Sequence, residues 1–264
     1  MATYLDRILD VHRTEAAADQ RILDVLVERA RMAPPTRGFG EALRGVPKGE
    51  PAIIAEVKRR SPSRGDLAAD LDPGTVAIQY AAGGAACLSV LTDRDHFGGS
   101  PEDLVSARDA VSVPVLRKDF TVDARDVCDA RLMGADAVLL IVAALDDAQL
   151  ADFHDLTDEV GLDALVEIHD EAELERALAI DARLVGVNQR DLVTFEVDTA
   201  RAVRMGPLMP DGVTRVAESG IRDRADAAPL LEAGYQALLV GESVVTSRDR
   251  RGAIRALRGL GTGE

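Results

Sequence analysis

The chain has 264 residues, 47% of them hydrophobic, and a formal net charge of −15 at pH 7. This length suits one large α/β domain, and the apolar residues suffice for a buried core without forming a membrane-length run. The negative charge argues against a nucleic-acid or anionic-membrane partner, because binding to either requires a basic face.

The N-terminus and the cysteines point to a reduced, cytoplasmic setting. Residues 1–10 have neither the basic-then-apolar order of a secretory signal nor the Arg-rich, acid-poor composition of a transit peptide. Cys87 and Cys128 lie apart in apolar stretches, which is typical of buried thiols rather than of a disulfide or a zinc site. We therefore expect a cytoplasmic protein with reduced cysteines.

The first predicted elements form a helical segment ahead of any strand. Residues 4–11 and 16–32 are amphipathic, and a breaker-rich stretch follows at residues 33–38. Residues 1–50 are therefore predicted to be an N-terminal helical extension. It could cover the bottom or side of the following domain, or it could help to close the mouth of an active site, and the spacing favours neither.

Eight strand-length apolar runs follow, at residues 52–57, 87–91, 114–116, 137–142, 164–168, 184–187, 215–217 and 237–240. Stretches of helical periodicity lie between them, for example at residues 147–160 and 171–180. Apolar strands with helical crossovers predict a parallel sheet covered on both faces. Eight units favour a closed (β/α)8 TIM barrel over residues 51–264, forming one structural domain with the extension. An open, doubly wound sheet is the alternative.

Polar residues stand at the carboxyl ends of the predicted strands, where barrels of this class have their active sites. Glu56 and Lys58 alternate with Val57 along the first strand, so both side chains should point into the upper part of the barrel. A surface ion pair is the alternative interpretation. It is disfavoured because a strand of a parallel barrel has no solvated face along its middle.

Later strands add further polar groups at the same level. Lys118 ends the third run in a chain with only three lysines, which suggests a need for an ammonium; this group can release a proton when its pKa is depressed, whereas a guanidinium cannot. Glu167 lies near the end of the fifth run and Asn188 follows the sixth. Glu167 could instead cap a helix or form an ion pair.

Glycines follow the last two runs, at Gly220 and Gly241. Glycine turns at these places expose backbone N–H groups, and barrels frequently bind phosphate there. The sequence contains no Walker-type loop, no G-x-G-x-x-G after a strand, no G-x-S-x-G and no H-E-x-x-H, and its histidines and cysteines lack metal-ligand spacing. We therefore expect neither a metal nor a cofactor.

Taken in order, these strand ends resemble the indole-3-glycerol-phosphate synthase family of tryptophan biosynthesis. The most specific stretches are residues 53–63 and 114–120, and the resemblance extends from about residue 50 to residue 245. It implies a carboxy-lyase that converts 1-(2-carboxyphenylamino)-1-deoxyribulose 5-phosphate to indole-3-glycerol phosphate by ring closure, decarboxylation and dehydration. The reaction uses general acid–base catalysis and needs no cofactor.

The resemblance also implies a role for individual residues. The family's catalytic positions, with a substrate-contacting serine among them, fall on Glu56, Lys58, Lys118, Glu167, Asn188 and Ser219. Its substrate and phosphate positions fall on Ser61, Phe97, Phe120, Arg190, Leu192, Gly220, Gly241 and Glu242. Lys118 is the candidate acid for ring closure. Glu242 is a departure, because a carboxylate near a phosphate is tolerable only if its backbone N–H does the binding.

Three other functional classes are open to the sequence. A lysine at a strand end could form a Schiff base, as in class I aldolases. An isomerase of a related phosphoribosyl substrate would need Cys or Asp as base at the first strand's end, where this chain has Glu56 and Lys58. A non-catalytic phosphoanion-binding barrel would lack one of the acid–base residues. The implied partner is a small phosphorylated substrate, and we expect a monomer, open to contact with other enzymes of the pathway.

The charge composition leads to a prediction about salt. Three lysines and a surplus of Asp over Glu suggest adaptation to molar intracellular salt. At low ionic strength, where the Debye length is about 30 Å, repulsion among carboxylates destabilises the compact state. We expect the melting temperature to rise between about 0.01 M and 1 M KCl, with turnover persisting at molar salt. Thermal melts across a KCl series measure this, and a flat or falling melting temperature would contradict it.

Overall fold

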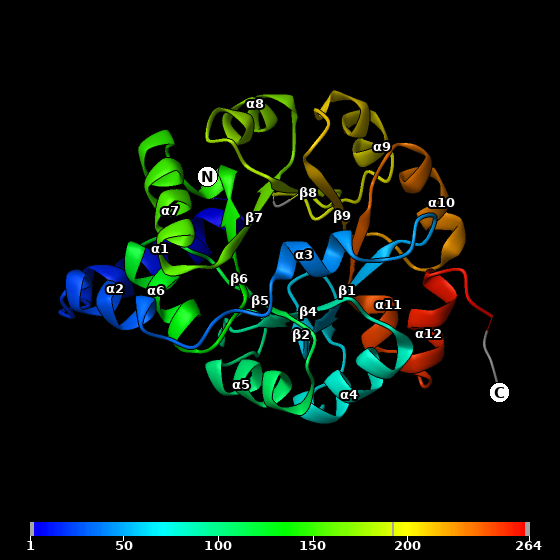
Figure 1. The fold of residues 1–264 in the computed structure, drawn as a ribbon, viewed down its shortest axis with the longest axis horizontal. Coiled ribbons are helices and arrows are strands. Elements are labelled where there is room, and N and C mark those ends of the chain that lie inside the picture. The colour runs from blue at the N-terminus through cyan, green and yellow to red at the C-terminus, as the bar shows by residue number, and fades with distance from the viewer. Residues whose placement is uncertain (1–2, 192, 262–264) are drawn as a thin grey trace.

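The computed structural model describes residues 3–191 and 193–261. Eight parallel strands close into a barrel in the order β1-β10-β9-β8-β7-β6-β5-β4, and helices surround it (Figure 1). This confirms the predicted (β/α)8 barrel. Each strand overlaps one predicted apolar run: β1 (Ala52–Val57), β4 (Cys87–Leu91), β5 (Val115–Lys118), β6 (Ala137–Ile141), β7 (Asp163–Ile168), β8 (Leu184–Asn188), β9 (Thr214–Glu218) and β10 (Ala237–Val240).

Most of the outer helices begin at side chains that cap them, whereas two, at Arg201–Met205 and Glu242–Val245, do not. The aspartate surplus noted above is partly used here, because aspartate side chains accept first-turn N–H groups at six helices. The helices after β1 are α4 (Pro73–Gly83), α5 (Pro101–Ala110), α6 (Ala124–Leu132), α7 (Asp147–Val160), α8 (Glu171–Ala179), α9 (Arg201–Met205), α10 (Arg224–Glu232), α11 (Glu242–Val245) and α12 (Arg250–Leu257). A short hairpin of β2 (Arg60–Ser61) and β3 (Gly65–Asp66) follows β1, and 3₁₀ turns cover Val142–Ala144 and Gly206–Leu208.

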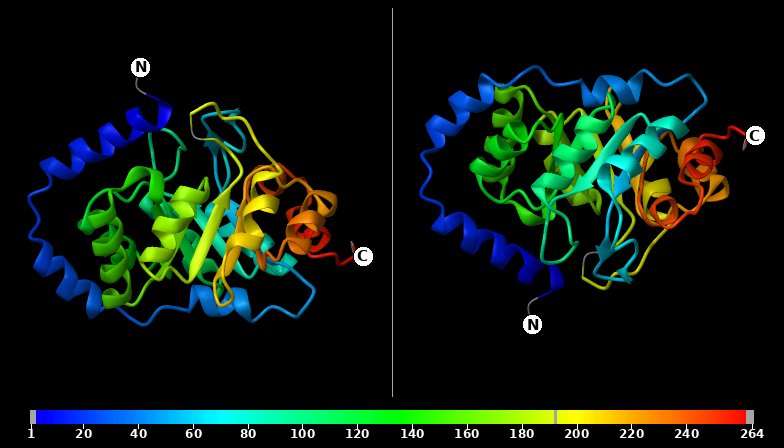
Figure 2. Two further views of the ribbon diagram at one scale, coloured as in Figure 1. Left: turned by 90° about the horizontal axis from the view of Figure 1, so that it is seen from above. Right: turned by 90° about the horizontal axis from the view of Figure 1, so that it is seen from below.

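The N-terminal extension reaches both ends of the barrel. It forms α1 (Tyr4–Ala18), α2 (Leu23–Arg31) and α3 (Phe39–Arg44). Helix α1 lies at the same end as the β2–β3 hairpin, whereas α3 lies at the opposite end (Figure 2). The helices therefore lie where each of the two roles left open by the sequence would place them.

Helix α1 begins at Tyr4 as predicted, but the other boundaries of the extension's helices differ from the prediction. Helix α1 continues to Ala18, and the turn after it forms because Asp19 accepts the Arg21 N–H at 2.8 Å and the Arg21 guanidinium. Helix α3 was not predicted, since it is only six residues long and follows a breaker-rich stretch. Gly38 is its N-cap, and the φ of 69° at this position favours glycine.

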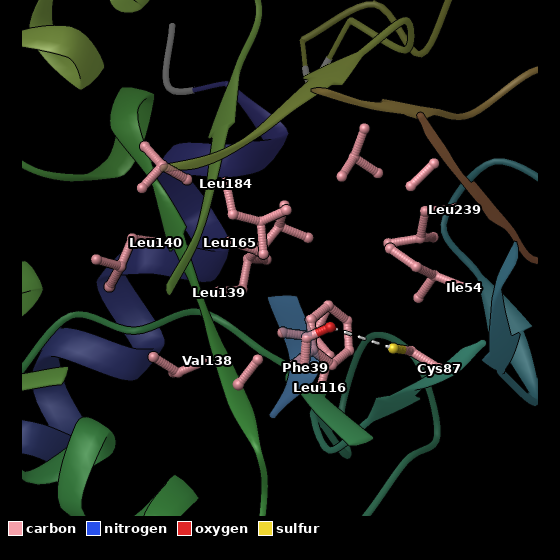
Figure 3. Close-up of a cluster of buried hydrophobic side chains, with 14 of the residues drawn as sticks. Phe39, Ile54, Cys87, Leu116, Val138, Leu139, Leu140, Leu165, Leu184 and Leu239 are labelled. Atoms are coloured by element: carbon pink, nitrogen blue, oxygen red, sulfur yellow. Dashed lines mark hydrogen bonds between the residues drawn. The ribbon is translucent and has the colours of Figure 1, made fainter. Parts of the chain in front are cut away.

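The interior of the barrel is apolar, and α3 contributes to it. Ile54, Leu116, Leu139 and Leu165 come from four strands and are almost completely buried (Figure 3). Phe39 of α3 joins the same cluster and is fully buried. Both cysteines are free and buried, as expected. Within residues 3–191 and 193–261, no helix has the length and apolar character to cross a bilayer.

A buried carboxylate holds the extension to the amino-terminal end of the barrel. Asp136 is fully buried just before β6, and its two oxygens accept the N–H groups of Arg37 and Val115, each at 2.8 Å. The Arg108 guanidinium lies 3.5 Å away and compensates the charge. Asp136 therefore joins the segment before α3 to β5 and α5.

Asp136→Ala is expected to lower the free energy of unfolding by about 3 kcal/mol or more, because it leaves two backbone N–H groups and a guanidinium without their acceptor. Urea unfolding measures this. Asp211→Ala, at an exposed loop position, is the matched control and should stay within about 0.5 kcal/mol of wild type. A loss below about 1 kcal/mol at Asp136 would show that the contact is dispensable.

Candidate active site

A cavity of about 490 Å³ lies at the carboxyl ends of the strands. It brings together all the residues assigned from the sequence that the structure describes, which are Glu56, Lys58, Ser61, Phe97, Lys118, Phe120, Glu167, Asn188, Arg190, Ser219, Gly220, Gly241 and Glu242. Leu192 lies outside the described residues. The cavity also has lining residues that the sequence did not indicate, among them Tyr4, Leu5, Ile8, Arg64 and Glu218.

The centre of the cavity is a lysine held by carboxylates from other strands. Lys118 ends β5, and its Nζ lies 3.3 Å from Oε2 of Glu167 on β7 and 3.9 Å from Oε2 of Glu218 on β9. Both glutamates are at most 2% exposed. Asn188, at the end of β8, donates from Nδ2 to Oε1 of Glu167 at 3.2 Å, and its own Oδ1 accepts the Arg190 N–H at 3.0 Å. Four strand ends thus share one polar network.

The charge state of Lys118 is set by carboxylates from other strands. Burial on its own would lower the pKa of this ammonium, but the charges of Glu167, Glu218 and Glu56 outweigh it and raise the pKa above its ordinary value. The sequence indicated only that a lysine could release a proton if its pKa were depressed; carboxylates from other strands shift the pKa of Lys118 in the opposite direction. Lys118 carries its proton at neutral pH.

The two glutamates around Lys118 have pKa values that diverge. Burial would raise the pKa of Glu167, but the charges of Lys118 and His169 and the hydrogen bond from Asn188 lower it. Burial, then repulsion from Glu167, raises the pKa of Glu218 well above its ordinary value. A site with one ionised and one protonated carboxyl can supply both a base and an acid.

Glu218 is the main residue that the sequence analysis left unassigned. The sequence pattern that could have indicated it is the one that indicated Glu56, namely a glutamate at the end of an apolar strand. Gly186 on β8 makes room for it, because a Cβ there would lie 2.1 Å from Glu218 Oε1. The glycine and the glutamate are 32 positions apart, so this relation is visible only in the fold.

Glu56 and Lys58 form a second polar pair beside the first. Glu56 ends β1 with Val57, and Oε1 of Glu56 accepts a hydrogen bond from Lys58 Nζ. Gly241 packs against both, since a Cβ on it would lie 2.3 Å from Glu56 Oε1 and 3.0 Å from Lys58 Nζ. The glycine after β10 is therefore required by close packing at this corner.

A third group of residues suits an anion. Ser219 and Gly220 follow β9 with φ values of 69° and 73°, and the buried Ser61 hydroxyl has no hydrogen-bond partner among the residues that the structure describes. The Glu242 carboxylate, the departure noted in the sequence, lies 3.2 Å from the Arg64 guanidinium on the β2–β3 hairpin. Its charge is thus partly compensated at the protein surface.

Apolar side chains form a further part of the wall. The rings of Phe97 and Phe120 lie 6.3 Å apart between centroids, with 39° between their planes. Leu5 and Ile8 of α1 line the cavity as well. The cavity therefore offers an acid–base network, an anion corner and a surface that fits a planar apolar group.

Glu218→Gln should be more stable relative to wild type at pH 8 than at pH 5. The folded-state pKa of Glu218 is raised above the unfolded value, so its stability contribution is fully present below about pH 4 and is lost as the pH rises through the raised pKa. Glutamine cannot ionise, so the variant loses no stability at this position as the pH rises. Urea unfolding at both pH values measures the difference. Glu232→Gln, at an exposed position, is the control. A difference from wild type that does not grow with pH would refute the raised pKa.

Comparison with known proteins gives the family. The sequence model described as "Indole-3-glycerol phosphate synthase" matches residues 5–257. An indole-3-glycerol phosphate synthase of Mycobacteroides abscessus is 48% identical, covering 98% of this chain and 95% of that protein. One of Nocardioides sp. is 54% identical, covering 79% and 80%.

A solved structure shares the fold. Thiamine phosphate pyrophosphorylase from Pyrococcus furiosus matches 79% of this chain and 94% of its own, with a TM-score of 0.59 and 15% identity. At that identity the likeness concerns the barrel alone. The match to the family model over nearly the whole chain is decisive: the chain belongs to the indole-3-glycerol phosphate synthase family.

Proposed function

We propose that this protein is an indole-3-glycerol phosphate synthase, a carboxy-lyase. It closes the indole ring of 1-(2-carboxyphenylamino)-1-deoxyribulose 5-phosphate with loss of CO2 and water. Family membership supports the activity. The observation that carries it is the placement of the Lys118 ammonium between Glu167 and Glu218, next to the pair of Glu56 and Lys58.

Ring closure uses the proton on Lys118. The aromatic carbon that bears the carboxylate attacks the ketone carbon, and the ketone oxygen takes up the proton as its negative charge develops. A raised lysine pKa does not prevent this transfer, because an alkoxide is a stronger base than the lysine amine. The ring becomes cationic in this step. The ionised Glu167, whose side chain is buried, stabilises that charge at short range.

Decarboxylation and dehydration follow at the second pair. Lys58, oriented by Glu56, binds the substrate carboxylate until CO2 leaves and its bonding electrons return to the ring. Lys58 then gives a proton to the departing hydroxyl, and Glu167 accepts the proton lost as the ring becomes aromatic. Asn188 and Ser219 position the sugar hydroxyls. General acid–base help of this kind contributes about 10²- to 10⁴-fold per group.

The phosphate is held at the anion corner. Backbone N–H groups at Gly220, Gly241 and Glu242 and the Ser61 hydroxyl, which has no partner within the described part of the chain, are the proposed donors. The Arg64 contact reduces the repulsion between the Glu242 carboxylate and the phosphate. Phe97 and Phe120 flank the aromatic ring, and Arg190 completes the wall of the pocket.

The wider setting is part of the same proposal. Residues 1–50 act as an extension of a catalytic barrel at 51–264, within one structural domain. The enzyme works in the cytoplasm as a monomer on a small phosphorylated substrate. A Schiff-base aldolase is the competing class, and the raised pKa of Lys118 argues against it, because the attacking amine must be neutral.

Lys118→Met should lower kcat at least 100-fold and leave KM nearly unchanged, since it removes a proton donor rather than a binding group. Formation of the fluorescent indole product from the carboxyphenylamino substrate measures both the proposed activity and its loss. Lys48→Met, at an exposed position, is the matched control.

Two results would overturn these assignments. Wild-type protein that forms no indole product would refute the synthase activity, and borohydride trapping of a covalent adduct would favour the aldolase class. Retention of more than about a tenth of the activity by Lys118→Met would remove Lys118 from the acid role alone.

A further inference from the structure

Helix α1 forms a wall of the cavity but buries little surface against the barrel. Leu5 and Ile8 line the cavity. Besides these two, only Leu9 of the helix is buried, and it is almost fully so. Tyr4 and Ala16 pack only partly buried against the core, and the Tyr4 ring lies 5.0 Å from that of Phe195 between centroids. Three fully packed apolar side chains hold a 15-residue helix weakly, so its polar contacts contribute strongly to how firmly this wall is placed.

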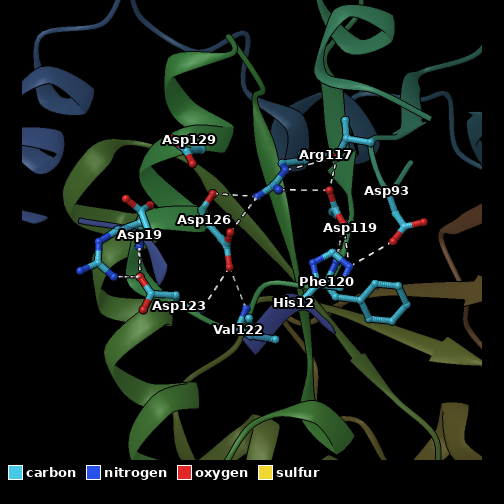
Figure 4. Close-up of polar contacts among 12 residues, drawn as sticks. His12, Asp19, Asp93, Arg117, Asp119, Phe120, Val122, Asp123, Asp126 and Asp129 are labelled. Atoms are coloured by element: carbon cyan, nitrogen blue, oxygen red, sulfur yellow. Dashed lines mark hydrogen bonds and ion pairs between the residues drawn. The ribbon is translucent and has the colours of Figure 1, made fainter. Parts of the chain in front are cut away.

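Two side chains of α1 make those polar contacts within the described part of the chain. The Arg13 guanidinium donates to the carbonyl of Ala144 at 2.9 Å. His12 Nε2 lies 3.1 Å from Oδ2 of Asp93, on the loop after β4 (Figure 4). The first is a contact to a neutral carbonyl, whereas the second reaches a buried carboxylate. The His12 contact is therefore the stronger candidate for an anchor.

Asp93 ties α1 and the loop after β4 together. The residue is 5% exposed. Its Oδ1 accepts the N–H groups of His96 at 2.6 Å and Phe97 at 3.0 Å, and its Oδ2 faces His12 Nε2 and His96 Nδ1, both at 3.1 Å. One carboxylate thus fixes both the anchor of α1 and the backbone of Phe97, which lines the cavity.

Asp119 extends the cluster to the loop after β5. Its Oδ1 accepts the Phe120 N–H at 2.9 Å and lies 3.9 Å from His12 Nε2. Its Oδ2 accepts from Thr92 and from Arg117, the latter at 3.1 Å, so its charge is already compensated. The His12 ring also lies 5.4 Å from the Phe120 ring, between centroids. His12 therefore lies next to both carboxylates that accept the backbone N–H groups of Phe97 and Phe120.

The negative charge of Asp93 has no arginine or lysine beside it among the contacts described above, and the side chains that face its Oδ2 are those of His12 and His96. Burial would lower the pKa of His12, but the hydrogen bond to Asp93 and the charges of Asp119, Asp93 and Asp126 raise it above the ordinary value. The contact with Asp93 is thus strongest below about pH 6.5 and weakens as the pH rises through the raised pKa of His12. His96 shares Asp93 and contributes to the same cluster.

The cluster is better interpreted as an ion-pair network than as a cation site. His12, Asp93 and Asp119 lie close enough together to suggest metal ligands. Each carboxylate oxygen, however, already accepts a hydrogen bond from an N–H or O–H group, and the Arg117 cation contacts Asp119 directly.

We infer that His12 is a positioning residue for substrate binding. Its contact with Asp93 holds α1 across the mouth of the barrel and places the apolar wall of Leu5 and Ile8 opposite the substrate's ring. The inference rests on the proposed function for the identity of that ring. The wall touches the substrate equally in the ground and transition states, so a loosened α1 raises KM and leaves kcat nearly unchanged.

His12→Gln tests this against His154→Gln, the same substitution on the outer helix α7. At pH 6, the first variant should raise KM about tenfold, the effect of losing one hydrogen bond between charged groups, with kcat within about twofold of wild type. Amide hydrogen exchange in α1 should be about tenfold faster, while the strand amides keep wild-type rates. His154→Gln should match wild type in all three measurements.

A pH series distinguishes whether His12 holds α1 through its ion pair with Asp93 or only through packing of its ring. Between pH 6 and pH 9 the KM of wild type should rise relative to that of His12→Gln, because only wild type loses the ion pair. Glu218 and His169, whose pKa values are also raised, are present in both proteins and cancel in the comparison.

Three outcomes would overturn the inference: an unchanged KM with unchanged α1 exchange in His12→Gln, a loss that falls on kcat, or a KM ratio between the two proteins that does not vary with pH. Hydrogen exchange needs no turnover. If wild type made no indole product, accelerated α1 exchange in His12→Gln would still support the anchor while the proposed function failed.

Discussion

A lysine ammonium enclosed by two buried glutamates is the interaction on which the active site depends. Lys118 lies 3.3 Å from Glu167 and 3.9 Å from Glu218, and neither glutamate could be buried as a lone charge without a large penalty. Together, one cation and two carboxyls settle into one ionised and one protonated acid. The same arrangement that makes their burial tolerable supplies the proton donor and the stabilising anion of the proposed reaction.

The barrel makes this arrangement possible because parallel strands bring their carboxyl ends to one level. Lys118, Glu167 and Glu218 come from strands β5, β7 and β9, and glycines keep the remaining space open. Gly186 admits the Glu218 carboxylate, and Gly241 admits the pair of Glu56 and Lys58. The N-terminal extension then adds α3 beneath the barrel and α1 over its mouth, so that stability and substrate contact are provided by one segment at two ends.

The sequence predicted the barrel well, because periodicity along a strand or helix is a local property. It also placed candidate site residues at or after the strand ends, and 13 of these 14 candidates line one cavity, while Leu192 is not described. What it missed depends on partners far along the chain. The raised pKa of Lys118 comes from glutamates on other strands, the place of Glu218 from Gly186, and the anchor of α1 from His12 and Asp93, which are 81 positions apart.

The most direct measurement of the central claim is NMR observation of the carboxyl carbons of Glu167 and Glu218 and of the Lys118 ammonium, through a pH titration of the unliganded protein. The account predicts that Glu218 stays protonated well above the ordinary glutamate pKa of about 4.3, that Glu167 ionises below it, and that Lys118 keeps its proton throughout the neutral range. Two glutamates that ionise together near the ordinary value, or a Lys118 that loses its proton near pH 7, would contradict the account.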